Sequence, residues 1–523
     1  MTKELGGNDA EEDREFTFTV TLKKRADGAK LDGTYTCTGT QTSLKFKLDD
    51  DGNAVATFKL KGGESLTIED ILDLTEYTVV ETDPTQYGYF TYIGEEETRE
   101  YSSTISDEEG AENAVTFTNV RNTGSIVLGK KFDGTGKNTV TTYSFTVKLW
   151  RDDDIKLTDN NLPTGATFTY DKDEGDYGTY TATVNVSVGK TLTIKDILTD
   201  TNVSIVEESY IAEGYTATTV EATEEGATTS DTDRSAESII TTGEQTVTYT
   251  NIRNAAPLTV TKKLDGNAAE EDREFTFTVT LTKRDDGAKL GGTYTCTDKD
   301  GKQTSLEFTQ SYDEETGEPT SDAVATFTLK GGESLTIEDI LDLTEYTVEE
   351  TDPTQYGYFT YIGGKETREY SSTISDEEGA ENAVTFTNVR NTGSITLTKQ
   401  VSGSGRTTVR NFTFTIKLWR DDAIKLTGVS EPDGLAFDYA DPYDNYAYGV
   451  YTATVTLNLD DDEDEMPSIK IGNILTDTHC SITEQSYLAN GYQEVSINGA
   501  GPVTVPKTEA EKVLTYTTDV TDE

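Results

Sequence analysis

One fifteen-residue segment limits the possible fold of this chain more than any other, and it occurs three times. Its copies are Thr116–Lys130, Thr248–Lys262 and Thr385–Lys399, and the last reads TFTNVRNTGSITLTK. Each half alternates polar and apolar residues as a β-strand does, and an Arg-Asn pair followed by small residues separates the halves. We interpret the segment as a junction, at which one β domain ends and the next begins.

Three junctions divide the 523 residues into four domains, each near the common domain size of ~100–150 residues. The first and third domains, 1–122 and 255–391, share long stretches such as LKGGESLTIEDILDLTEYTV and form type A. The second and fourth, 123–254 and 392–523, share stretches such as FTxKLWRD and form type B. The sequence therefore predicts a tandem array with the order A, B, A, B.

Within each domain the hydrophobic period is two. Phe275, Phe277, Val279 and Leu281 alternate with polar residues, and Gly and Asp clusters separate such runs. This pattern predicts an all-β chain of tandem immunoglobulin-like antiparallel β-sandwiches. The linkers are short, so we expect an elongated, semi-rigid rod. A TI-x-D/N-IL segment recurs in all four domains, and for it we expect one helical turn; the copies are Ile68–Leu72, Ile194–Leu198, Ile337–Leu341 and Ile471–Leu475.

Charge and cysteine content exclude several classes of protein. The formal net charge is −53, which argues against nucleic acid and anionic membranes as partners. Each domain has at most one of the three cysteines, Cys37, Cys296 and Cys480, so neither a disulfide within a domain nor a metal-binding spacing is available. We expect no cofactor and no metal. A conventional enzyme is also not expected, because His479 is the sole histidine and no cofactor fingerprint recurs.

The ends of the chain predict a fragment of a longer, extracellular protein. No apolar run approaches the ~20 residues that span a membrane, and the N-terminus does not resemble a signal peptide. Residues 2–24 align with 261–283, but the Leu-Thr-Val before Thr261 has no counterpart before Thr2. We therefore expect a truncated first strand, and a fragment that lacks its signal peptide and its anchor and does not insert into a membrane.

In each of the first three domains, three polar residues follow apolar neighbours onto the predicted core face. Alternation along the first strand of a domain brings a Lys inward, along a middle strand a Glu, and along the last strand an Asn. The Glu lies eight positions before the Tyr of a Gly-Tyr pair in all four domains. The complete sets are Lys3, Glu81 and Asn119; Lys130, Glu207 and Asn251; and Lys262, Glu350 and Asn388.

Burying such groups alone and charged costs several kcal/mol each, so their recurrence needs an explanation. Amide exchange uses this combination. A buried Lys loses its proton and becomes a nucleophile, and a buried Glu stays protonated and polarises the Asn carbonyl. Attack on the carboxamide releases ammonia and leaves a Lys–Asn isopeptide bond. A buried salt bridge with a hydrogen-bonded Asn is the simpler alternative.

The constellation resembles the intramolecular isopeptide domains of Gram-positive surface proteins, namely the Cna B-type domain and the streptococcal major-pilin domain. The resemblance covers the whole chain in four copies and is carried by LTVTKKLDGN (258–267), FTLKGGESLTI (327–337), YTVEE (346–350) and VTFTNVRN (384–391). It implies the cross-links Lys3–Asn119, Lys130–Asn251 and Lys262–Asn388, promoted by Glu81, Glu207 and Glu350. It also implies a stalk or shaft segment of a bacterial cell-surface adhesin or pilus-like protein, in which self-cross-linking turns over once.

The fourth domain departs from this pattern. Lys399 and Glu484 are in place, but Thr518 falls where Asn is expected. Threonine has no carbonyl to attack, and Asp519 is on the other face unless a bulge shifts it. We predict that the fourth domain has no bond, with Glu484 idle and Lys399 unlinked.

An alternative function is a ligand-binding adhesin, in which the B domains contact a host protein or glycan through the loops Glu221–Glu244 and Gly428–Tyr448. Other parts of the same surface protein are further expected partners. We interpret the acidic run Asp460–Glu465 as a solvated turn rather than a calcium site, because it lacks the glycine and the spacing of an EF-hand loop. Trp150 and Trp419 are expected to be packing residues rather than carbohydrate platforms.

Overall fold

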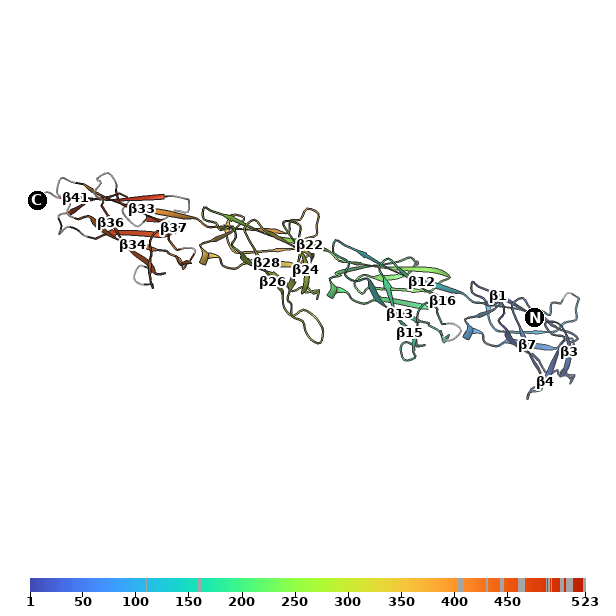
Figure 1. The fold of residues 1–523 in the computed structure, drawn as a ribbon. Helices are drawn as coiled ribbons and strands as arrows, with labels where there is room; N and C mark the ends of the chain where they lie inside the picture. The colour runs from blue at the N-terminus through green and yellow to red at the C-terminus, as the bar shows by residue number, and fades with distance from the viewer. Residues whose placement is uncertain are drawn as a thin grey trace. The chain divides into compact units, whose positions relative to one another are not determined.

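The computed structural model describes residues 1–109, 111–157, 162–402, 409–428, 431–442, 446–459, 466–485, 487, 490, 492–498, 503–504 and 511–520, the last three ranges as backbone only. The chain forms two compact units, Met1–Gly134 with Asn138–Arg253, and Thr135–Lys137 with Asn254–Glu523. Each unit contains two all-β repeats, which confirms the predicted fold class (Figure 1). Among the described residues, no helix has the length and hydrophobicity needed to cross a bilayer.

The first unit contains the first two repeats. The first repeat consists of β1 (Thr2–Gly6), β2 (Phe16–Leu22), β3 (Gly33–Gly39), β4 (Ser43–Leu48), β5 (Ala54–Leu60), β6 (Leu66–Ile68), β7 (Glu76–Glu81), η1 (Thr85–Tyr87), β8 (Phe90–Ile93), β9 (Glu96–Glu97), β10 (Glu100–Thr104) and β11 (Thr116–Val120). The second consists of β12 (Thr123–Asp133), β13 (Thr142–Trp150), β14 (Thr169–Asp171), β15 (Thr179–Ser187), β16 (Thr191–Leu198), β17 (Asn202–Glu207), η2 (Ile211–Glu213), β18 (Ala217–Ala222), β19 (Thr228–Ser230), β20 (Ser235–Ile239) and β21 (Gly243–Ile252).

The second unit contains the other two repeats. The third repeat consists of β22 (Ala255–Asp265), β23 (Phe275–Leu281), β24 (Gly292–Asp298), β25 (Gln303–Phe308), β26 (Ala323–Leu329), β27 (Ser334–Leu341), β28 (Glu345–Glu350), η3 (Thr354–Tyr356), β29 (Phe359–Ile362), β30 (Lys365–Glu366), β31 (Glu369–Thr373) and β32 (Ala383–Val389). The fourth consists of β33 (Thr392–Ser402), β34 (Asn411–Trp419), β35 (Asp438–Ala440), β36 (Val450–Asn458), β37 (Ser468–Leu475), β38 (His479–Glu484), β39 (Tyr492–Asn498), β40 (Val503–Thr504) and β41 (Glu511–Val520).

Each repeat is a sandwich of two sheets. In the third repeat one sheet has the order β25-β24-β27-β22-β32-β29-β30 and the other the order β26-β23-β28-β31. Among the described strands the ladders are antiparallel, except that the first and last strands of each repeat pair in parallel. This parallel pair places the beginning and the end of a repeat side by side in one sheet.

The core lies between the two sheets. Phe277 of β23 stacks on Phe327 within its own sheet at 5.6 Å, and meets Phe386 of the facing sheet edge-to-face at 5.1 Å. All three rings belong to the alternating apolar set of their strands. Each buried aromatic or aliphatic side chain contributes about 1.5–3 kcal/mol, so this alternation supplies most of the driving force for folding.

The TI-x-D/N-IL segments are not helical turns, contrary to expectation. In the last three repeats they lie within strands β16, β27 and β37. Leu258 pairs with Ile337 and Ala256 with Ile340, so β27 has one extra residue at this point, a β-bulge. Asp339 occupies the bulge with φ of 68°, a left-handed conformation that Asp adopts more readily than most residues. The alternating pattern cannot show the bulge, because the extra residue breaks the period of two.

The stretch Glu221–Glu244, expected to be an irregular loop, is also largely folded. It contains β19 and β20, and β20 pairs with β17 over five residues. The proposed loop Gly428–Tyr448 lies partly outside the described residues, and the acidic run Asp460–Glu465 lies outside them entirely.

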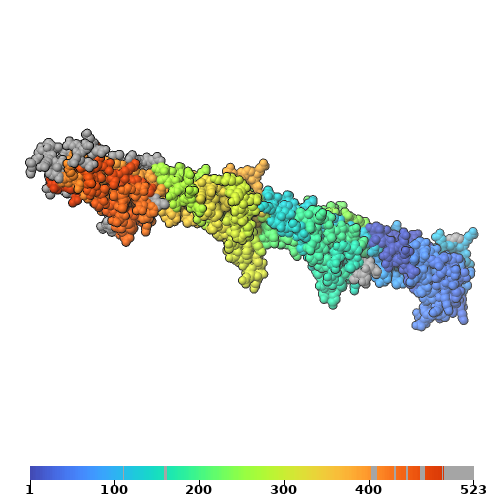
Figure 2. Space-filling view, viewed as in Figure 1, coloured from blue at the N-terminus to red at the C-terminus, as the bar shows by residue number. Residues whose placement is uncertain are grey.

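The clearest difference in loop length between the two type A repeats is the connection from β25 to β26. It projects from the third repeat and is yellow in Figure 2. Gln310 holds its base, because its side-chain oxygen accepts from the backbone N–H groups of Leu290 and Gly291 at 2.9 Å and its side-chain NH₂ donates to the Ser321 carbonyl at 3.0 Å.

Candidate functional site

The sandwich brings the predicted Lys, Glu and Asn together between its sheets. In the parallel pair β22–β32, Lys262 lies opposite Phe386, and Asn388 lies opposite Leu264 two residues further along. Lys and Asn are therefore diagonal neighbours on the inner face of one sheet. Glu350 comes from β28 in the facing sheet. All three side chains are fully buried.

In the third repeat one carboxylate oxygen joins the trio. Lys262 Nζ donates to Glu350 Oε1 at 2.7 Å, and Asn388 Nδ2 donates to the same oxygen at 2.8 Å. The lysine nitrogen and the amide nitrogen can therefore be no more than about 5.5 Å apart, the sum of those two distances. The amine and the carboxamide lie within reach of each other without rearrangement of the backbone.

The first repeat has the same arrangement of Lys, Glu and Asn, although its first strand is shorter. β1 has five residues where β22 has eleven. Lys3 is nevertheless fully buried, with Nζ 3.5 Å from Glu81 Oε1 and 3.2 Å from the Phe117 carbonyl oxygen, to which it donates. Asn119 Nδ2 donates to Glu81 Oε1 at 2.8 Å.

In the second repeat Lys130 and Glu207 form a fully buried ion pair, with Nζ and Oε1 2.8 Å apart. Asn251 is buried beside them, and its Oδ1 accepts a hydrogen bond from Thr218 at 2.9 Å. A hydroxyl on this oxygen withdraws electron density from the amide carbon. The amide in this repeat is therefore polarised by Thr218, which no motif in the sequence distinguishes.

Burial sets the proton affinities of the trio. It lowers the pKa of Lys3, Lys130 and Lys262 to about 8, because desolvation outweighs the attraction of the neighbouring Glu. Desolvation likewise raises the pKa of Glu81 and Glu207, against the opposing effect of their lysines. Both shifts favour a neutral amine beside a protonated carboxyl group.

An aromatic ring lies beneath every one of these lysines. The distances from Nζ to the ring centroid are 4.7 Å for Lys3 and Phe16, 4.3 Å for Lys130 and Tyr143, 4.3 Å for Lys262 and Phe275, and 4.5 Å for Lys399 and Phe412. The ring closes the site against water and stabilises the ammonium form before reaction. The sequence shows this residue as the first apolar position of the strand that follows the Lys strand, but nothing marks it as special.

The orientation of the Asn carboxamide bears on its reactivity. Asn119 Oδ1 and Asn388 Oδ1 are buried and accept no hydrogen bond. In this orientation Nδ2 lies 2.8 Å from a Glu oxygen. Rotating the carboxamide by a half-turn exchanges its oxygen and nitrogen, so that Oδ1 takes the place of Nδ2 beside the Glu. A protonated Glu then donates to this carbonyl oxygen and satisfies it.

Threonines complete the site and were missed from the sequence. Thr91 and Thr360 pair with the Asn of the neighbouring strand and donate to the second oxygen of Glu81 and Glu350, at 2.7 and 2.6 Å. Thr218 has the same cross-strand position beside Asn251. Each follows a Gly-Tyr pair by two or three residues, which is the available signal, but threonine fills so many strand positions here that it does not stand out.

The fourth repeat has half of the site. Lys399 is buried, with Nζ 2.9 Å from Glu484 Oε1, and Glu484 is partly buried. In the parallel pair β33–β41, Val401 lies opposite Thr518 and Ser402 opposite Asp519. Thr518 therefore has the register position that Asn has in the other repeats, as the alternation predicts.

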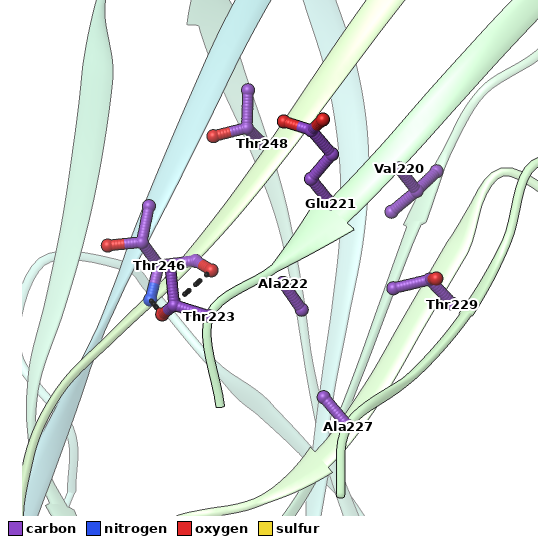
Figure 3. A pocket seen from close by; sticks show the side chains of 8 residues that line it. All are labelled: Val220, Glu221, Ala222, Thr223, Ala227, Thr229, Thr246 and Thr248. Carbon is purple, nitrogen blue, oxygen red and sulfur yellow. Dashed lines mark hydrogen bonds between the residues drawn. The ribbon is translucent and has the colours of Figure 1, made fainter. Parts of the chain in front are cut away.

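A hollow of about 540 Å³ lies elsewhere in the second repeat, at β18 and β19 (Figure 3). Thr223 closes one side through two hydrogen bonds to Thr246, accepting from its N–H at 2.9 Å. The lining comprises threonine, alanine and valine side chains with one carboxylate, Glu221. Among these lining residues there is no aromatic ring and no cation, so the hollow offers little to recognise a glycan or a protein.

The fold and the buried groups define the chain as a tandem array of all-β repeats, each with a lysine–glutamate pair between its sheets. The family model described as "Domain of unknown function (DUF7601)" matches residues 1–121, 124–253, 256–390 and 393–521. The chain belongs to this family.

A comparison with solved structures finds two pilus proteins and one further bacterial protein among the matches. The major pilin of Streptococcus pyogenes is 16% identical over 51% of this chain and 98% of the pilin, with a TM-score of 0.25. The Bacillus anthracis TIE protein is 12% identical over 96% of this chain and 69% of its own, with a TM-score of 0.25. The pilus-presented adhesin Cpa is 15% identical over 71% and 99%, with a TM-score of 0.22. No curated protein sequence matches the chain.

Proposed function

We propose that the chain is a stalk segment of a bacterial surface or pilus-like protein, and that three of its four repeats are locked by Lys–Asn isopeptide bonds. The observation that carries this proposal is the burial of an amine, a carboxyl group and a carboxamide together in three repeats, with the Asn hydrogen-bonded to the Glu in the first and third and the Lys ion-paired with the Glu in all three. The pairs are Lys3 with Asn119, Lys130 with Asn251 and Lys262 with Asn388. An extracellular location is part of the proposal.

The chemistry is one amide exchange per repeat. The neutral lysine Nζ attacks the Asn Cγ while the protonated Glu donates to Oδ1 and stabilises the oxyanion. As Nζ gives up a proton to the Glu carboxyl group, that group gives up its own, so that one proton in total is transferred from Nζ to the departing Nδ2. The Nζ–Cγ bond forms, the Cγ–Nδ2 bond breaks, and one ammonia leaves. The Glu ends as it began, and the site turns over once.

The bond joins the first and last strands of a repeat. Between Lys262 and Asn388 it closes a loop of about 125 residues, worth ~4–5 kcal/mol in the chain-entropy model. Tension along the backbone also passes directly from one strand to the other, so the intervening fold is not pulled apart. The chain gains this lock without a disulfide, since its three cysteines are free and buried.

The intact mass of the purified, folded protein tests the proposal. We expect a mass below that of the sequence by three ammonias, and tandem mass spectrometry of a digest should join Lys262 to Asn388. Folded protein with an unmodified mass would show that the trio is only a buried salt bridge with a hydrogen-bonded Asn.

An Asn388→Ala variant, which leaves Lys262 unlinked, is expected to become more stable as pH rises from 8 to 10.5. The pKa of Lys262 is about 8 in the folded state against 10.5 when unperturbed. The unfolded chain therefore binds more protons throughout this window, so unfolding becomes harder as pH rises, by on the order of 2 kcal/mol. Urea unfolding at several pH values measures the effect. The double variant Asn388→Ala, Lys262→Met has no such amine and should lack this rise; a rise of equal size there would contradict the prediction.

A further inference from the structure

The outer face of one sheet in the second repeat carries a tryptophan. Trp150 is the last residue of β13, and it is half-buried, whereas Leu149 before it is fully buried. Because successive side chains of a strand point to opposite faces, the indole lies on the solvent side of the sheet. The other residues of β13 on this face are polar, namely Thr142, Ser144, Thr146 and Lys148.

Trp150 belongs to a row of side chains that crosses three strands. Asn202 of β17 lies opposite Trp150, and Ile239 of β20 lies opposite Asn202. Ile239 is 54% exposed. Neighbouring strands are ~4.8 Å apart, so the row is about 10 Å long. It places an aromatic ring, a carboxamide and an exposed aliphatic side chain on one stretch of surface.

The type A repeats have polar residues at the position of this tryptophan. Trp150 lies five residues after the Phe that pairs with the buried Glu, and this position is Lys23 in the first repeat and Thr282 in the third. Lys23 forms an exposed ion pair with Glu76 at 3.5 Å, and the Thr282 N–H donates to the Glu345 carbonyl at 2.8 Å. The aromatic group is therefore a property of the type B repeats and not of the sandwich as such.

The fourth repeat shows that this position accepts a flat ring. Trp419 takes the place of Trp150, and His479 takes the place of Asn202. The imidazole stacks on the indole with centroids 5.4 Å apart and planes inclined by 23°, and Tyr446 meets the indole edge-to-face at 5.3 Å, so Trp419 packs as expected. Trp150 has no ring contact with any residue that the structure describes. The indole face that His479 covers in the fourth repeat thus has no stacked ring in the second.

A hydrogen-bonded pair of planar polar groups borders the indole of the second repeat. Asn202 Nδ2 donates to Asp152 Oδ2 at 3.0 Å, and both groups are accessible to solvent. This bond leaves Oδ1 of Asp152 and Oδ1 of Asn202 available as acceptors. A saccharide has the complementary chemistry, because the C–H groups of a sugar ring pack on an aromatic face while its hydroxyl groups donate hydrogen bonds.

We propose that Trp150, Asp152, Asn202 and Ile239 form a binding site for a neutral saccharide on the second repeat. One sugar ring stacks on the indole as His479 does in the fourth repeat, its hydroxyls donate to Asp152 and Asn202, and the next sugar contacts Ile239. A row about 10 Å long suits a short oligosaccharide, and it is far smaller than the ~800 Å² that each partner buries in a stable protein interface. The site lies on a sheet face and not on the loops considered above, and it does not depend on the cross-links.

The charges around the row select an uncharged ligand. Asp152 borders the indole, and Glu237 lies on the same face of β20 as Ile239. The nearby Lys148 is paired with Glu174 at 2.5 Å. A sialylated or sulfated glycan would be repelled by these acids and by the net charge of −53, and it would find no free cation in the row to bind it.

An array of neutral, anionic and cationic oligosaccharides tests the class of ligand. The full chain should bind neutral members, and this binding should persist when salt is raised, because no ion pair contributes to it. Calorimetry with the neutral oligosaccharide that binds best should give one site per chain, since His479 covers the equivalent indole. Binding to charged members alone, or to none, overturns the proposal.

Three variants locate the binding. Trp150→Ala should weaken it at least about tenfold, and Trp419→Ala, the matched change in the fourth repeat, should leave it unchanged. Asn202→His copies the fourth repeat and should abolish binding while Trp150 stays in place, because the imidazole covers the indole. All three changes lie on the outer face, and the unfolding temperature checks that each protein is folded. Wild-type binding by Trp150→Ala or by Asn202→His overturns the proposal.

Discussion

Replacing Glu350 by alanine is expected to make the third repeat extensible under tension. Without the carboxyl group, Lys262 has no acid to hold it or to polarise Asn388, so the bond does not form. The chain between these residues, about 125 residues, is then free to unravel, which adds about 400 Å of length. Removing one partner of a buried pair also costs about 3–5 kcal/mol, and the lost cross-link a further ~4–5 kcal/mol.

Single-molecule stretching and intact mass measure these effects together. The variant should lose two ammonias where the wild type loses three, and should show one more long extension. Glu484→Ala is the matched control, because it removes the equivalent acid from a repeat without an Asn partner and should leave the mass deficit at three. If Glu350→Ala still loses three ammonias, the acid is not required for the reaction.

Much of the site can be predicted from the sequence because it depends on the period of two. Lys262, Glu350 and Asn388 each follow two apolar residues on the same face of a strand, and that rule alone places them in the core. The rule also assigns Thr518 its register position in the fourth repeat. Which strand faces which is not contained in the pattern, so the distances within the trio had to come from the fold.

Features that interrupt the two-residue hydrophobic period, or that do not depend on it, were not predicted. The bulge at Asp339 adds one residue to a strand, which alternation cannot register. Thr360 belongs to the site because it lies beside Asn388 on the neighbouring strand and donates to Glu350. Its neighbours in the sequence are ordinary strand residues, so they do not mark it. Strands β19 and β20 are short and polar, and they form because β20 pairs with β17 and β19 pairs with β20.

Replacing Thr518 by asparagine is expected to create a fourth bond. Thr518 lies opposite Val401, as Asn388 lies opposite Leu264 in the third repeat. The other reactants are already in place, with Lys399 fully buried and its Nζ 2.9 Å from Glu484 Oε1. The mass deficit should rise from three ammonias to four, and the new cross-link should add ~4–5 kcal/mol to the stability of this repeat.

Asp519→Asn provides the register control. Asp519 lies opposite Ser402, one residue further along, and a shift of one residue moves a side chain to the other face of the sheet. Asn at 519 should therefore leave the deficit at three ammonias. A fourth ammonia lost from Asp519→Asn but not from Thr518→Asn would mean that the last strand is shifted by one residue. Under tension, the wild-type chain should lengthen by about 400 Å at its fourth repeat, and Thr518→Asn should abolish that step. The same substitution thus tests the chemistry by mass and the mechanical role by length.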